Sequence, residues 1–105
     1  MSVQAFAADD CQTNRQQMID KDDVQVWATT LCNKSRLEFH THQTARVLIP
    51  EQDGMIKVLY KNGDSQIIKL AKGVPAYLPV SEGLMPHQDI NIGSEKLRVM
   101  VISIR

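Results

Sequence analysis

The chain has 105 residues, a length that fits one domain with a single hydrophobic core. It carries 12 basic and 12 acidic residues, so no strongly basic surface indicates nucleic acid as a partner. No apolar run reaches the roughly 18 residues of a membrane-spanning helix, and we therefore expect no membrane partner.

The first 22 residues are predicted to form an N-terminal arm ahead of a domain over residues 23–105. Residues 9–20 are polar and weakly periodic, a pattern typical of a short helix or of an arm lying on the domain. Ala5-x-Ala7 before an acidic stretch resembles the end of a secretory signal, although the basic and apolar regions of such a signal are missing. This remnant favours a periplasmic or secreted protein, with a cytoplasmic protein as the alternative.

The two cysteines, Cys11 and Cys32, do not form a CxxC pair, which argues against a zinc knuckle or a thioredoxin-type motif. Either both are unpaired thiols, or one disulfide joins the N-terminal segment to the first strands. The disulfide is expected if the chain is exported, because disulfides persist in oxidising compartments.

Eight short strands are predicted after the arm. The strongest local signal is Asn62-Gly63 between two alternating apolar runs, which is typical of a β-hairpin. Residues 80–86 are expected to form a loop. Regular turn signals without a long helix favour an antiparallel sandwich or barrel. The expected strands are 24–31, 36–42, 45–49, 55–60, 65–70, 75–79, 87–92 and 97–104.

The last strand, 97–104, is apolar on both of its alternating sets of side chains. Only one set can face the core, so we expect another part of the structure to shield the other set from water. The arm is one candidate and a second copy of the chain is the other. We predict a homodimer.

Two histidines, His40 and His42, alternate within the predicted strand 36–42. Side chains at this spacing share one face, with Cβ atoms roughly 7 Å apart, so both imidazoles can reach one metal ion. His87 begins a later strand and can arrive opposite the pair in a closed barrel. Alternatively, an HxH pair arises by chance, and the histidines line a polar cavity that holds water.

The order of these features resembles the cupin superfamily over residues 24–104. The first cupin motif is built on HxH, and the second runs from Gly through Pro and His to Asn. The resemblance is greatest to small single-domain cupins related to the beta-alanine degradation protein BauB. It implies an all-β double-stranded β-helix, the cupin jelly-roll barrel, with about eight strands. The matching positions are His40, His42, Pro50 and Gly54 in the first motif, and Gly73, Pro79, His87 and Asn91 in the second.

The resemblance implies that the three histidines are metal ligands, but the chain departs from the family pattern. The usual glutamate ligand is absent, because its position falls on Arg46 or Val47, and Lys34 replaces the first glycine. No fourth protein ligand can therefore be carried over. The loop before His87 is longer than usual in the family, and it is expected to bring Glu82 and Met85 near the mouth of the pocket. The candidate pocket or supporting residues are Gln43, Arg46, Glu82, Met85, Gln88 and Asn91.

Three neutral imidazoles leave the charge of a divalent ion uncompensated, so the pocket is expected to attract a small anion. Arg46 adds to this if it points inward; the alternative is an outward, solvated arginine. Nitrogen ligands alone do not separate Zn, Ni, Fe, Cu and Mn. The prediction is a metal-binding cupin, either a dioxygenase- or isomerase-like enzyme acting on a small anionic molecule or a non-catalytic binding module. A purely structural barrel is the third reading.

Overall fold

The computed structural model describes residues 11–105. Over this range the chain forms eight strands in two antiparallel sheets and one four-residue helix. The all-β class predicted from the sequence is confirmed. The Ala5-x-Ala7 motif lies outside the described residues. Within them, no helix has the length and apolar character needed to cross a membrane.

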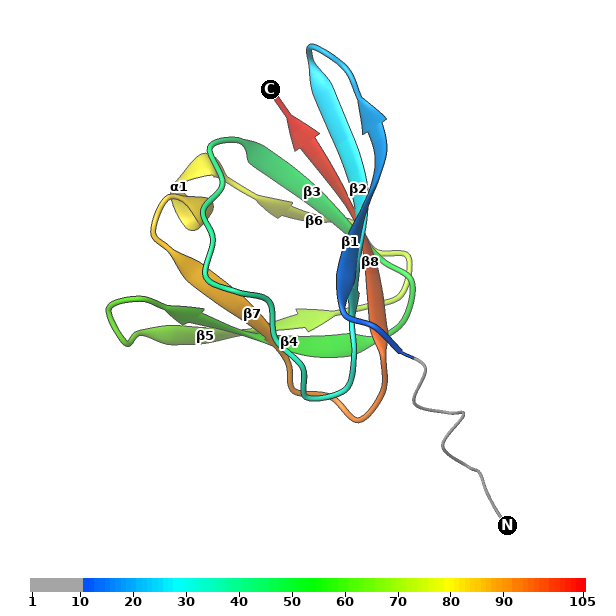
Figure 1. Cartoon of the computed structure of the whole chain (residues 1–105), viewed down its shortest axis with the longest axis vertical. Coiled ribbons are helices and arrows are strands. Elements are labelled where there is room, and N and C mark those ends of the chain that lie inside the picture. Colours follow the sequence, from blue (N-terminus) through cyan, green and yellow to red (C-terminus); the bar gives the residue numbers. More distant parts are fainter. Residues whose placement is uncertain (1–10) are drawn as a thin grey trace.

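The larger sheet has the strand order β1-β2-β8-β3-β6, and the smaller sheet has the order β5-β4-β7. Figure 1 shows the two sheets inclined to each other around a common interior, with α1 beside the segment that joins β2 to β3. The strands are β1 Asn14–Asp20, β2 Val24–Leu31, β3 Ala45–Pro50, β4 Gly54–Tyr60, β5 Ser65–Leu70, β6 Ala76–Leu78, β7 His87–Asn91 and β8 Leu97–Ile104, and the helix is α1 Val80–Gly83.

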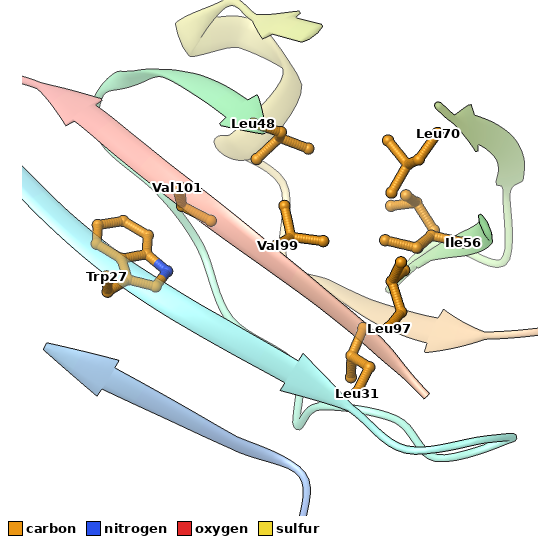
Figure 2. Close-up of a cluster of buried hydrophobic side chains, with 9 residues drawn as sticks. Trp27, Leu31, Leu48, Ile56, Leu70, Leu97, Val99 and Val101 are labelled. Atoms are coloured by element: carbon orange, nitrogen blue, oxygen red, sulfur yellow. The ribbon is translucent and has the colours of Figure 1, made fainter. Parts of the chain in front are cut away.

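The hydrophobic core lies between the two sheets. Alternate residues of β8 point inward, and Figure 2 shows Leu97 and Val99 directed toward Ile56 of the opposite sheet. Aliphatic side chains dominate this core, and Trp27 is its only aromatic member among the fully buried residues described. The core residues are Trp27, Leu31, Leu48, Ile56, Val58, Leu70, Leu97, Val99 and Val101.

The outer face of the larger sheet carries an apolar row that crosses all five strands. The ladder pairs successive members of this row, and the residues next to them in β2, β8 and β3 belong to the inward-facing core set. Tyr77 is the most open member, at 64% exposure. The second apolar set of β8 therefore faces outward, as its alternation requires. In order across the sheet, the row is Ile19, Val26, Ile102, Val47 and Tyr77.

The segment before the first predicted strand is itself a strand, so the short-helix alternative is wrong. β1 pairs with β2 from Asn14 opposite Thr30 to Asp20 opposite Gln25, with an irregularity between Gln17 and Ile19. All seven residues of β1 are exposed, which explains their weak periodicity in the sequence. The segment is extended because the unpaired backbone groups at the edge of β2 form hydrogen bonds with it. The local sequence pattern does not reveal these partners.

The predicted strand over residues 36–42 is also wrong as a continuous strand. The segment runs along β7 but makes only isolated bridges, Arg36 with Ile90 and His40 with His87. A bend at Phe39 interrupts the ladder between them. The loop expected at 80–86 contains α1, and the other seven predicted strands are found with ends within one residue of those expected.

Candidate metal centre

Backbone hydrogen bonds position the three histidines. The amide of His40 donates to the carbonyl of His87 at 2.8 Å, and the amide of His87 donates back to the carbonyl of His40 at 3.0 Å. This reciprocal pair holds the two residues opposite each other. The amide of His42 donates to the carbonyl of Gly83 in α1 at 2.8 Å. Three chain segments therefore meet at the cluster.

The rings of two histidines are oriented by carbonyl groups. His40 Nδ1 lies 2.7 Å from the carbonyl oxygen of Glu38, and His87 Nδ1 lies 2.9 Å from that of Met85. A carbonyl oxygen only accepts, so each Nδ1 carries the hydrogen and each neutral ring keeps its lone pair on Nε2. Metal-binding histidines are commonly oriented by such a bond from the other ring nitrogen.

The histidine cluster is compact. One ring nitrogen from each of the three residues can be chosen so that all lie within 4.8 Å of one another. The centroid of the His40 ring lies 4.8 Å from that of His42 and 4.6 Å from that of His87. Tetrahedral zinc with bonds of about 2.05 Å places its ligand atoms about 3.4 Å apart. The three ring nitrogens lie close enough together for this donor set to fit a divalent transition metal.

The His42 imidazole is held in its neutral form. Burial lowers the pKa of His42 to about 3, and the positive charge of Arg46 is the next cause. Its ring lies nearly parallel to that of Trp27, with centroids 6.2 Å apart. Because metal binding requires neutral imidazole, this environment favours ligation near neutral pH.

Asp89 is a neighbour of the cluster that the sequence analysis missed. Its Oδ2 lies 3.6 Å from Nε2 of His40, and its side chain lines the same cavity. Burial raises the pKa of the Asp89 carboxyl, while the neighbouring histidines act against that rise. The available signal was its position two residues after His87, which places both side chains on one face of β7. The Asp89 carboxylate therefore lies beside the cluster, although the group that could hold one ion consists of the three histidines alone among the described residues.

No protein-family model matches the chain, and no curated protein matches it in sequence. Solved structures do match. A cupin domain protein from Bordetella pertussis superposes with a TM-score of 0.77 at 22% identity, covering 89% of this chain and 93% of that one. An RmlC-like cupin family protein from Methanocaldococcus jannaschii, described as a double-stranded β-helix, gives 0.69 at 18% identity, covering 99% and 90%. The chain has the cupin fold. The predicted double-stranded β-helix is confirmed, whereas the finer BauB-type resemblance stays a prediction.

Arg46 points into the cupin barrel, so the outward, solvated alternative is wrong. The residue is only 4% exposed, and its Nη2 donates to Glu82 Oε1 at 2.8 Å. The Tyr60 hydroxyl donates to Glu82 Oε2 at 3.0 Å, so both carboxylate oxygens of Glu82 are engaged. The Arg46 Nε hydrogen is buried without a partner among the described residues. A buried donor without a partner is costly.

Gly83 lets α1 approach the histidine segment closely. A Cβ atom at this position would lie 2.8 Å from the Cβ of His42 and 3.0 Å from Nη2 of Arg46. Ordinary carbon contacts are about 3.5–4.0 Å, so no larger residue fits without displacement of the site. The sequence analysis missed this glycine, since only the packed structure shows what lies beside it.

Four other candidates do not line the cavity that contains the histidines. Gln43 is exposed, and Met85 contributes its carbonyl rather than its side chain. Gln88 donates to the carbonyl of Leu37, which ties the histidine segment to β7. Asn91 is buried and donates to the carbonyls of Leu31 and Glu95, which orders the turn after β7. These contacts support the site from outside its wall.

The cavity has a volume of about 500 Å³ and is lined by residues of both sheets. That is within the roughly 300–1,000 Å³ of small-molecule sites. Its wall is mostly apolar and includes Trp27, Leu48 and Val101, with the histidines grouped on one part of it. Three arginines and three carboxylates also line it, so their formal charges cancel. The charged lining residues are Arg15, Arg36, Arg46, Glu38, Glu82 and Asp89.

The two cysteines are joined by a disulfide in the structure. Cys11 precedes β1 and Cys32 follows β2, so the bond ties the start of the first strand to the end of the second. The amide of Cys32 also donates to the Thr13 hydroxyl at 3.0 Å. The N-terminal edge of the larger sheet is therefore anchored near the cavity.

Proposed function

We propose that this cupin binds one divalent transition metal, Zn, Ni, Fe, Cu or Mn, through His40, His42 and His87. The carbonyl bonds to Nδ1 of His40 and His87 carry the proposal, because they leave both Nε2 lone pairs for a metal. Asp89 is proposed as the fourth donor on the basis of its position beside His40. A bound metal would supply Lewis acidity at the cavity wall.

The metal-bound cavity is proposed to hold a small anionic molecule. The inward position of Arg46 in the cavity wall supports an oxygen-bearing ligand. Because the charges of the lining side chains cancel, the metal would make the cavity net positive. The function supported best is a metal-dependent cupin of dioxygenase or isomerase type. A non-catalytic binding module shares the binding step, and turnover of small carboxylates by each metal-loaded form separates the two.

The metal site is tested by removing metal with a chelator and reloading one metal at a time. Elemental analysis should find one equivalent of at least one of the five metals in the wild-type protein. His42→Ala should lose most of it and stay folded. Thr41→Ala is the matched control, because this exposed residue lies between the two histidines. Stoichiometric metal in His42→Ala, or none in the wild type, would refute the proposal.

Two further features are proposed for the protein as a whole. Export to the periplasm or the exterior is supported by the disulfide between Cys11 and Cys32. A BauB-type relationship is supported by the HxH pair, which runs into Pro50, and by His87 shortly before Asn91. Localisation of the tagged full-length protein tests the first of these.

A further inference from the structure

Arg15 brings a charged side chain from β1 into the cavity wall. It lies opposite Thr29 in the ladder between β1 and β2. Its guanidinium carbon lies 3.7 Å from the centroid of the Trp27 ring, which is 4% exposed. Arg15 and the three histidines line the same cavity. β1, which the sequence analysis placed in the N-terminal arm, therefore contributes a side chain to the cavity that contains the histidines.

The charge of Arg15 is not matched within residues 11–105. Arg46 is paired with Glu82, and Arg36 donates to the Gln88 side chain. Arg15 makes no ion pair or side-chain hydrogen bond in the described part of the chain. Stacking on an aromatic ring occupies the face of a guanidinium and leaves its in-plane N–H groups free. These groups form the fork that binds a carboxylate through two hydrogen bonds.

The position of Arg15 is set before any ligand arrives. The disulfide at Cys11 and the bond from the Cys32 amide to Thr13 fix the chain just ahead of it. Partial burial against Trp27 also lowers the pKa of the Arg15 guanidinium. A guanidinium stays charged even so. A guanidinium stacked on a ring above an anchored strand loses less freedom when it binds an anion than a free surface arginine does.

The wall next to Arg15 is apolar. Trp27 lies directly beneath the guanidinium, and Leu48 and Val101 continue the same surface through the ladder of the larger sheet. A small ligand that consists of a charged group alone would not cover this apolar wall. A ligand with both a carboxylate and an apolar body would cover it.

We infer that Arg15 is a specificity residue that pairs with the carboxylate of a small organic acid whose apolar body lies along Trp27 and the aliphatic wall. This rests on the proposed function, because it names the ligand class of the same cavity. The carboxylate accepts two hydrogen bonds from the in-plane N–H groups of Arg15. The three histidines line the same cavity, so the rest of the acid lies next to the proposed metal centre.

Calorimetric titration with hexanoate, its neutral isostere hexanamide and the shorter acetate tests the inference on zinc-loaded protein. Hexanoate should bind more tightly than both other probes. Arg15→Gln should weaken hexanoate binding by about tenfold or more, as expected for a lost charged hydrogen-bond pair. Lys69→Gln removes the same charge from an exposed residue outside the cavity and should leave binding within about twofold.

Arg15→Lys keeps the charge but loses the planar fork, so it should recover only part of the affinity. It also serves if Arg15→Gln fails to fold. Equal binding of hexanoate and hexanamide, no binding of hexanoate to the wild type, or full affinity in Arg15→Gln would overturn the inference. The same titrations on chelator-treated protein separate the two proposals. Metal uptake together with hexanoate binding that does not depend on Arg15 refutes this inference alone. Arg15-dependent hexanoate binding by a protein that takes up no metal refutes only the proposed metal function.

Discussion

Replacing Gly83 with alanine separates local helix preference from the packing of the site. Gly83 is the last residue of α1, where alanine should stabilise a helix by at most about 1 kcal/mol. The packed structure predicts the opposite sign. The new Cβ would lie 2.8 Å from the Cβ of His42, about 1 Å inside an ordinary carbon contact.

Two contacts determine how much Gly83→Ala should lower the free energy of unfolding. Overpacking of this kind costs about 1–3 kcal/mol. Moving α1 outward would also stretch the bond from the His42 amide to the Gly83 carbonyl, now 2.8 Å, whose loss costs about 1 kcal/mol. Against the gain in helix preference, the free energy of unfolding should fall by about 2 kcal/mol. Moving His42 by about 1 Å should weaken zinc affinity about 10- to 100-fold, the range seen when the support of a ligand is lost.

Urea denaturation of the metal-free protein and zinc titration against a chromophoric chelator measure the two effects. Ser81→Ala is the control, because it adds alanine to the same helix at an exposed position. It should leave stability within about 0.5 kcal/mol. If Gly83→Ala is as stable as the wild type and binds zinc equally well, the close approach of α1 to His42 does not position the site.

Four other predictions can be checked on the purified protein. Asp89→Asn should lower zinc affinity about tenfold or more in the same chelator competition, and unchanged affinity would remove Asp89 from the donor set. Because the pKa of His42 is depressed to about 3, the unfolded chain binds more protons at this residue between pH 6.5 and 3, and stability of the metal-free protein should fall as pH falls through that window. His42→Gln should show a shallower decline in urea denaturation, and parallel curves would count against the shift. The apolar outer row predicts a homodimer by light scattering at high micromolar concentration, with Tyr77→Glu shifting it toward monomer; a monomeric wild type would contradict this. Reducing the bond between Cys11 and Cys32 should lower the unfolding free energy by about 3 kcal/mol in the chain-entropy model, and an unchanged urea midpoint would argue against that contribution.

Much of the barrel could be predicted from the sequence because strands carry a local signal. Alternation with a period of two and the Asn62-Gly63 turn depend only on neighbouring residues, and seven of the eight strands they predict are present. The spacing of His40 and His42 likewise places both rings on one side, and His87 does arrive opposite them. The prediction that the rings share one side holds even though the histidine segment makes only isolated bridges to β7 and is not a continuous strand.

The remaining features depend on partners that are distant in the chain. The polar residues of β1 have no local pattern, and only the free edge of β2 makes them a strand and brings Arg15 over Trp27. A sequence also cannot show that Gly83 lies against His42, because that contact exists only after α1 packs on the histidine segment.

The sequence by itself determined the all-β class, the turns and the three histidines as a candidate set, since each follows from the period of a strand or from a local turn preference. Only the tertiary structure decided that Arg46 points inward to Glu82 and that Asp89 lies 3.6 Å from the His40 ring. The physical reason is that burial and charge pairing are set by segments that meet across the barrel. Their meeting depends on strand order and register, which no single segment of the chain encodes.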